Sequence, residues 1–117
     1  MSITPEQGAR QLRARSDARA AKARTRREEV RSKLGAATAL LRRAGADRVW
    51  LFGSLADAHA TTAGDVDLAC SGMAARSYFD VLADLMTLFG TPVDLVLLER
   101  APASLRDRVV ETGEELR

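Results

Sequence analysis

The spacing of apolar residues along the chain separates it into alternating helices and strands. Apolar residues recur every three or four positions in some segments, which predicts helices, and form short β-prone or alternating runs in others, which predicts strands. The predicted helices cover residues 4–29, 30–45, 78–89 and 103–112. The predicted strands cover residues 49–52, 65–70 and 93–98, and residues 55–63 form a short helix or a loop. Because helices and strands share one core, the fold class is α/β or α+β.

The first predicted helix is polar almost throughout, unlike the rest of the chain. Leu12 is the only large apolar residue in the body of this helix, which is otherwise rich in Ala and Arg. With so little to bury, the stretch is either an exposed helix or a tail that a partner orders. We expect a basic helical arm over residues 1–29 and a domain over residues 30–117, with Gly35 as a candidate point of separation.

Charge is distributed unevenly between the two parts of the chain. The net charge of the 117 residues is +2, but residues 1–48 carry 13 Lys/Arg against 5 Asp/Glu, a net of +8. Residues 49–117 carry 5 Lys/Arg against 11 Asp/Glu, a net of −6. This asymmetry indicates a polyanionic or acidic partner for the arm, and the alternative is a solvated helix that carries more Arg than Glu.

Composition argues against several classes of protein. The chain has no apolar run long enough to span a membrane and no apolar segment typical of a secretory signal. Its single cysteine, Cys70, cannot form an internal disulfide and fits a reducing cytoplasm. A single histidine and a single cysteine give no cluster of zinc ligands. We therefore expect a cytoplasmic protein without zinc.

Three aspartates interrupt segments that are otherwise apolar. Asp65 and Asp67 flank Val66 in a predicted strand, and Asp94 repeats the pattern in the next one. Side chains two positions apart on a strand point the same way, and adjacent carboxylates repel unless a cation neutralises them. Oxygen ligands without His or Cys favour Mg²⁺ or Mn²⁺. In a two-metal site Asp65 and Asp67 would hold the ions and a triphosphate, and Asp94 would contact the nucleophile's ion and take its proton.

A Gly-Ser pair follows the first buried strand and precedes these carboxylates. Gly53 permits close approach of a phosphate, and the turn with Ser54 offers backbone N–H groups and a hydroxyl to the β- and γ-phosphates. A Gly-Ser turn alone carries little information. Its position between a buried strand and the Asp pair makes it a candidate nucleotide-binding element.

These motifs in combination resemble the DNA polymerase β-type nucleotidyltransferases, in particular the minimal nucleotidyltransferase (MNT) branch. The resemblance rests on Leu-Phe-Gly-Ser, ten residues, Asp-Val-Asp-Leu and then Pro-Val-Asp-Leu-Val, and it runs from about residue 30 to the end. It implies a small mixed β-sheet flanked by helices. It also implies transfer of a nucleoside monophosphate from a triphosphate, usually ATP, to a hydroxyl, with release of pyrophosphate.

Many proteins of this size and pattern resemble the antitoxin of a HEPN-type toxin RNase. In that family the MNT protein is implied to silence the toxin by attaching AMP to a toxin tyrosine. The small size fits this reading, because nucleotidyltransferases that act on antibiotics or RNA generally need a separate substrate-binding domain, for which this chain has no room.

Two positions depart from the family pattern, and two alternatives stay open. Asp57 stands where the family often has Arg, which weakens the hold on phosphate, and Gly64 stands where Ser often precedes the first Asp.

One alternative function is an MNT-like antitoxin that acts by binding alone. The other is a protein whose basic arm, residues 1–29, binds the phosphates of DNA or RNA.

Overall fold

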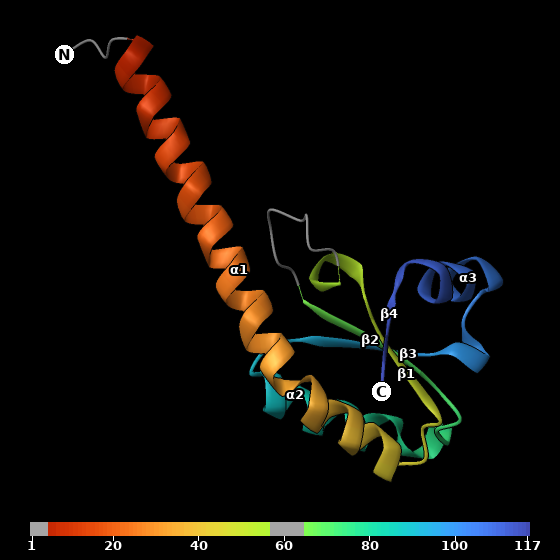
Figure 1. Cartoon of the computed structure of the whole chain (residues 1–117). Coiled ribbons are helices and arrows are strands. Elements are labelled where there is room, and N and C mark those ends of the chain that lie inside the picture. Colours follow the sequence, from red (N-terminus) through yellow and green to blue (C-terminus); the bar gives the residue numbers. More distant parts are fainter. Residues whose placement is uncertain (1–4, 57–64) are drawn as a thin grey trace.

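The computed structural model describes the backbone of residues 5–56 and 65–117 and the side chains of residues 17–56 and 65–117. Helices and strands alternate along these segments (Figure 1). The α-helices are α1 (Pro5–Arg43), α2 (Tyr78–Phe89) and α3 (Ala103–Thr112). The strands are β1 (Arg48–Phe52), β2 (Val66–Ser71), β3 (Val93–Leu97) and β4 (Glu114–Leu116). Short 3₁₀ turns are η1 (Gly53–Leu55), η2 (Ala75–Ser77) and η3 (Leu98–Arg100).

The strands form one mixed sheet in the order β3-β2-β1-β4. β1 runs antiparallel to both β2 and β4, whereas β2 and β3 are parallel. A parallel pair needs a crossover connection, and α2 provides it between β2 and β3. The expected small mixed sheet flanked by helices is therefore confirmed.

Helices cover both faces of the sheet and define two cores of unequal size. Figure 1 shows α2 and the C-terminal part of α1 together on one face, and α3 on the other. The larger core joins Leu41 of α1 and Leu85 of α2 to alternate residues of the strands, such as Leu51 and Leu68. The smaller core, beneath α3, contains Trp50 and Val109. The larger core takes Val66 and Leu68 of β2, so the residue between them, Asp67, points to the face that carries α3.

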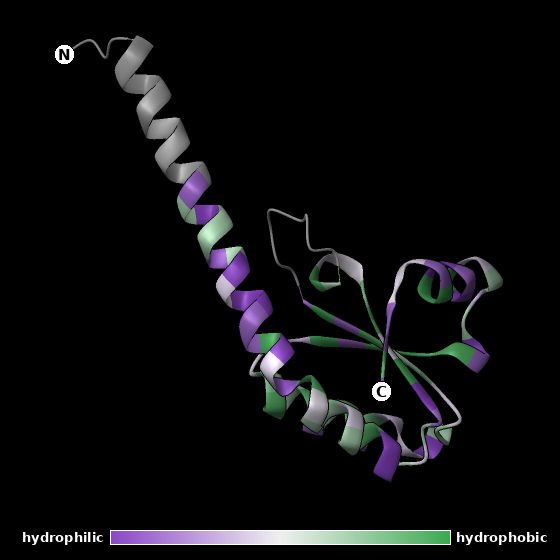
Figure 2. Ribbon diagram, in the orientation of Figure 1, coloured by the Kyte–Doolittle hydropathy of each residue, from purple (hydrophilic) through white to green (hydrophobic). Residues whose placement is uncertain are grey.

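The N-terminal helix is a single element rather than two. Helix α1 spans 39 residues, about 58 Å at the usual rise, and passes through Gly35 without interruption. The expected inward-facing positions, among them Val30 and Leu34, are buried. Earlier in the helix the coloured residues are mainly hydrophilic (Figure 2), and this part projects past the sheet. The C-terminal part of the helix packs into the larger core, and Ala23 is buried farther toward the N-terminus.

Replacing Gly35 by Ala is expected to stabilise the protein by about 1 kcal/mol, because Gly is a poor residue for the interior of an exposed helix. A Cβ added there meets nothing within 4 Å. Urea denaturation would measure the gain, and the reverse change at the exposed neighbour Ala36 (Ala36→Gly) should cost a similar amount. An unchanged midpoint in both variants would mean that this part of α1 does not unfold together with the domain.

Strand β4 is absent from the pattern-based prediction, which ended with the last helix. Its three residues include two glutamates and show no apolar alternation that could be recognised. Its place is set by long-range contacts, since it pairs with β1 in antiparallel register. Arg31 of α1 binds Glu114 at 2.9 Å, and Arg48 binds Glu115 at 2.6 Å. Each exposed ion pair stabilises little, so the backbone pairing with β1 is the main support of this strand.

In the described part of the chain, no helix combines the length and apolar character needed to cross a bilayer.

Candidate active site

The register of two parallel strands brings two of the predicted carboxylates side by side. Asp67 on β2 lies directly opposite Asp94 on β3. The alternate residues of β2, such as Val66 and Leu68, are buried in the larger core, so Asp67 points to the opposite face. Asp65 precedes β2 by one residue and has the same parity as Asp67. The three predicted carboxylates therefore lie on the same face, at the end of the sheet where β2 and β3 begin, and Asp67 and Asp94 are direct neighbours.

The environment of these carboxylates is electrostatically unfavourable without a cation. Asp67 is half-buried, while Asp65 and Asp94 are exposed. Burial raises the pKa of Asp67 to about 6, with further contributions from the charge of Asp94, a hydrogen bond with its carboxyl group, and the charge of Asp65. The folded protein thus holds negative charge in a place where a proton or a metal ion is needed to relieve repulsion.

The Gly-Ser turn lies against the same carboxylates. Phe52, the last residue of β1, lies opposite Asp67, and the chain then enters η1 at Gly53. Gly53 has a φ of 74°, which L-residues rarely adopt, and a Cβ at this position would collide with the Asp67 carboxylate. Ser54 follows as a half-buried residue. The sequence places a glycine here for two independent reasons: the backbone conformation and the space that Asp67 needs.

The donor set fits a hard cation that arrives with a phosphate ligand. Among residues 17–56 and 65–117, no three His, Cys, Asp or Glu side chains form a ready-made metal cluster. Mg²⁺ does not require one, because it is usually held by one or two carboxylates together with substrate phosphates and water. The Asp67–Asp94 pair, with Asp65 two positions away along the chain, supplies such oxygens, and Gly53 leaves room for the Asp67 carboxylate. The residues therefore fit Mg²⁺ or Mn²⁺ bound together with a nucleotide.

The raised pKa of Asp67 predicts that the free protein loses stability as the pH rises through about 6. The folded-state pKa lies above the ordinary value of 3.8, so between these values the folded protein binds more protons than the unfolded chain. The stability that depends on this carboxyl is fully present at pH values below its unfolded-state pKa of 3.8. After a discount for the solvent that still reaches this carboxyl, the loss between pH 5 and pH 8 is on the order of 1 kcal/mol. Urea titrations across this range should show the slope in the wild type and not in Asp67→Asn.

A suitable control for that titration is the exposed Asp84 of α2. Asp84→Asn should keep the wild-type slope, since this side chain lies away from the carboxylate group. Equal slopes in the wild type and in Asp67→Asn would show that the raised pKa does not affect folding.

Several residues near these motifs have structural roles. Trp50 is buried, with the Arg48 guanidinium 4.6 Å from its ring centre. Cys70 is buried, and burial with the nearby charge of Glu99 raises the pKa of its thiol to about 11, so the thiol is no nucleophile at neutral pH. The Tyr78 hydroxyl donates a hydrogen bond of 2.8 Å to the Leu95 carbonyl. The departures at Asp57 and Gly64, which bear on phosphate binding, lie outside the described residues.

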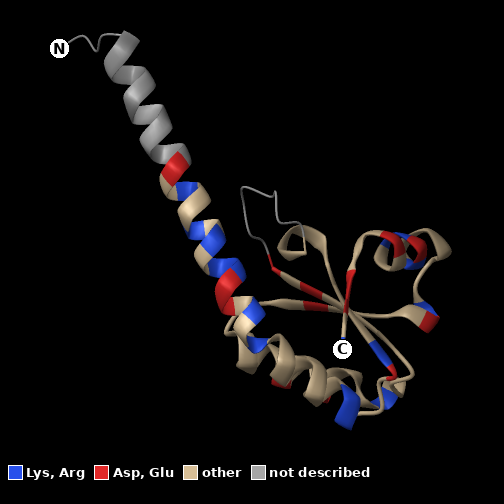
Figure 3. Cartoon of the chain, viewed as in Figure 1, with Lys and Arg blue, Asp and Glu red and all other residues tan. Residues whose placement is uncertain are grey.

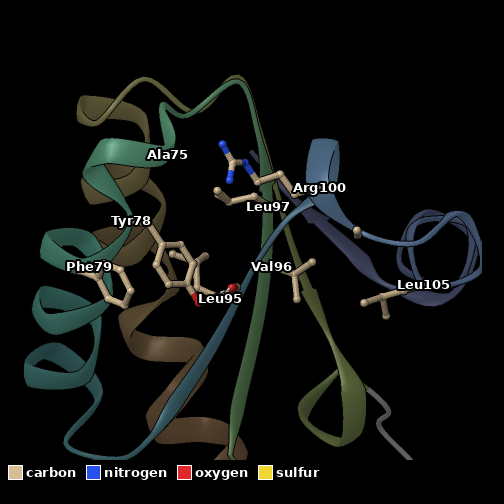
Figure 4. A pocket seen from close by; sticks show the side chains of 9 residues that line it. Ala75, Tyr78, Phe79, Leu95, Val96, Leu97, Arg100 and Leu105 are labelled. Carbon is tan, nitrogen blue, oxygen red and sulfur yellow. Dashed lines mark hydrogen bonds between the residues drawn. The ribbon is translucent and has the colours of Figure 1, made fainter.

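A groove along the outer edge of β3 did not emerge from the sequence. It has a volume of about 450 Å³ and is lined mainly by apolar side chains from the start of α2, β3 and the start of α3 (Figure 4). The only cue in the sequence is that Phe79 falls outside the inward-facing apolar stripe of its helix. In the structure this side chain is 79% exposed. We call this feature the β3 groove.

Comparison with known proteins places the chain among nucleotidyltransferases. The family model described as "Polymerase beta, Nucleotidyltransferase" matches residues 38–117. No curated protein sequence matches the chain. Among solved structures, a protein described as a minimal nucleotidyltransferase is 29% identical with a TM-score of 0.65, and the match covers 78% of this chain and 94% of that one.

Several of the matched chains come from toxin–antitoxin complexes. A chain of a toxin–antitoxin complex with AMP-PNP is 26% identical with a TM-score of 0.59, and the match covers 68% of each chain. A chain of the complex between the tri-AMPylated Shewanella oneidensis HEPN toxin and an MNT antitoxin is 22% identical with a TM-score of 0.55. That match covers 80% of this chain and 71% of the other, and at this identity it shows a shared fold alone.

Proposed function

Since the chain belongs to the polymerase β nucleotidyltransferase family, we propose that it transfers AMP from ATP to a hydroxyl group of a partner protein. We propose further that the partner is a HEPN-type toxin, that the hydroxyl belongs to a tyrosine, and that this chain acts as the antitoxin. The observation that carries the proposal is the placement of Asp67 opposite Asp94 beside the Gly53 turn. A related fold occurs in an MNT antitoxin whose HEPN toxin is tri-AMPylated.

Each residue of the site has a separate task in this proposal. Asp65 and Asp67 hold Mg²⁺ or Mn²⁺, and with it the triphosphate, while the backbone N–H groups of the turn at Gly53 and Ser54 bind phosphate oxygens. The bound metal ion supplies charge neutralisation and polarisation at the phosphates. Asp94 is exposed, as a base that meets a second substrate must be. These roles divide the site into a phosphate-holding side at β2 and an acceptor side at β3.

The transfer is a single displacement at the α-phosphorus. The acceptor oxygen attacks that phosphorus and forms the new P–O bond, and its proton passes to the Asp94 carboxylate. The bond from the α-phosphorus to the oxygen that bridges to the β-phosphate breaks, and pyrophosphate leaves with that oxygen. The acceptor then carries AMP, and no oxidant or further reactant is needed.

Labelled ATP tests the proposal directly. The purified protein is incubated with Mg²⁺ and a lysate of its host, with ATP labelled either at the α-phosphate or at the γ-phosphate. We expect a protein band that carries the α-label and not the γ-label, since AMP transfer retains only the first phosphate. A neighbouring gene for a small helical protein with an Arg-x₄–₆-His motif would support the identity of the acceptor. Absence of α-label in the presence of that protein would exclude AMP transfer to it.

Neutralisation of a toxin by binding alone remains a separate proposal. It is favoured by Asp57, an acid where the family often has Arg, because this change weakens the hold on phosphate. In this case an Asp65→Asn/Asp67→Asn double variant would still neutralise the toxin without attaching AMP. If the double variant loses both neutralisation and labelling, the chemistry itself is responsible for the antitoxin effect.

The cations of α1 support nucleic-acid contact as a further candidate function. Figure 3 shows basic residues repeated along the projecting part of this helix, and Arg19, Lys22 and Arg24 are exposed there. Contacts to phosphates would make binding of RNA or DNA fall steeply between about 50 and 200 mM salt. Replacement of these three residues by Glu should then abolish the binding, as measured by fluorescence anisotropy. Equal binding by the variant would exclude this role for the arm.

A further inference from the structure

The β3 groove lies at the free edge of the sheet. β3 is the last strand in the order β3-β2-β1-β4, so among the described residues no strand pairs with its outer edge. The groove follows this edge from η3 toward the middle of β3 (Figure 4). The lining residues used below are Tyr78, Phe79, Leu95, Val96, Arg100 and Leu105.

The walls of the groove are apolar and contain one cation. Phe79 is 79% exposed and is held edge-on against Tyr78, with ring centres 5.2 Å apart. Val96 and Leu105 form the opposite wall, toward α3 (Figure 4). Arg100 is exposed at one end, and no ion pair engages it among residues 17–56 and 65–117. A matching ligand has apolar or aromatic side chains and a carboxylate at the end that meets Arg100.

Tyr78 determines how a ligand can use this edge. Its hydroxyl donates a hydrogen bond of 2.8 Å to the Leu95 carbonyl. This bond uses a backbone acceptor on the outer side of β3. A continuous strand added to the edge would need that carbonyl for its own ladder. The groove therefore suits side chains that insert between α2 and α3 rather than an additional β-strand.

The groove and the carboxylate site share a strand. Val96 follows Asp94 by two positions, so both side chains lie on the same face of β3, about 7 Å apart along the strand. A protein segment seated in the groove thus lies next to the carboxylate proposed to receive the acceptor's proton. The nucleotide-holding residues Asp67 and Gly53 lie on the other side of Asp94, toward β2 and β1.

We propose that the β3 groove is the docking site for the acceptor protein. An apolar or aromatic segment of the acceptor inserts between Phe79 and Leu105, a carboxylate of that segment pairs with Arg100, and the reactive hydroxyl reaches Asp94 from this side. This inference rests on the proposed AMP transfer and names the surface that selects its substrate. It assigns substrate recognition to residues that take no part in holding ATP.

The test uses two groove variants and two matched controls in the full chain. Phe79→Ala removes an exposed aromatic wall, and Arg100→Glu reverses the cation at the end of the groove. Met86→Ala on α2 and Val110→Ala on α3 remove other exposed apolar side chains that do not line it. The probe is the acceptor protein that the wild type labels from α-labelled ATP, and each variant is measured for acceptor KM, for kcat and for affinity for Mg²⁺-ATP.

We expect each groove variant to raise the acceptor KM at least about tenfold, with affinity for Mg²⁺-ATP unchanged. The unchanged ATP affinity shows that the variants are folded, and both controls should behave as the wild type. Wild-type acceptor KM in both groove variants would overturn the docking site while leaving AMP transfer intact. If the wild type labels no acceptor, the proposed function itself has failed, and the docking role fails with it. Concentration-dependent dimerisation that Phe79→Ala abolishes would assign the groove to a second copy and likewise overturn the proposal.

Discussion

The Asp67→Asn variant is expected to lose AMP transfer by about 10³-fold or more, which corresponds to about 4 kcal/mol of lost transition-state stabilisation. Asp67 is the carboxylate against which both the Gly53 turn and Asp94 lie, so its charge serves the metal and the phosphates together. The variant should stay folded, because a neutral amide avoids both the burial of a charge and the repulsion by Asp94 and Asp65, which together raise the pKa of Asp67. Initial rates with α-labelled ATP, together with urea denaturation at pH 7.5, would show low activity in a protein at least as stable as the wild type.

Two further variants separate the roles within the site. Asp94→Asn should lower kcat by a similar factor while it preserves more of the affinity for Mg²⁺-ATP, because its proposed task concerns the acceptor's proton. Asp84→Asn, an exposed change on α2, should leave transfer unaltered. Full activity of Asp67→Asn would rule out this carboxylate as a metal ligand and would move the chemistry elsewhere in the molecule.

The Gly53→Ala variant is expected to destabilise the protein by about 2–4 kcal/mol and to abolish nucleotide binding. The first contribution is conformational, since an L-residue in the left-handed region costs roughly 1–2 kcal/mol. The second is steric, since the new methyl group would occupy the place of the Asp67 carboxylate. That carboxylate would have to move, and the site would lose its arrangement even if the chain still folds. Urea denaturation and titration with Mg²⁺-ATP measure the two effects separately.

Gly90 provides a control that isolates the steric part. Its φ is 66°, close to the 74° of Gly53, but a Cβ added there meets nothing within 4 Å. Gly90→Ala should therefore cost only the conformational contribution, about 1–2 kcal/mol, and should leave nucleotide binding intact. Equal destabilisation by the two variants would mean that Asp67 moves aside without cost, which would contradict a rigid site around Gly53.

The candidate site could be predicted from the sequence to the extent that its geometry is local. Alternation along a strand places Asp65 and Asp67 on one face whatever the rest of the fold does. A buried run that ends in Gly53 and Ser54 likewise signals a turn after a strand. By contrast, Asp67 and Asp94 lie opposite each other only because of the register between two strands, at positions 27 residues apart in the chain. That register forms when α2 crosses from β2 to β3 and the larger core packs.

The sequence by itself determined the fold class, the main helices and strands, the acidic and Gly-Ser motifs, and the contrast between a basic arm and an acidic body. These features follow from periodicity, from charge and from the conformational preferences of single residues, all of which act over a few positions. Only the tertiary structure decided that α1 continues through Gly35, that β4 completes the sheet, and that Gly53 abuts Asp67. The β3 groove belongs to the same group, since its walls come from α2, β3 and α3. Such contacts form between segments far apart in the chain, where the collective packing of the core, rather than any local pattern, selects which residues meet.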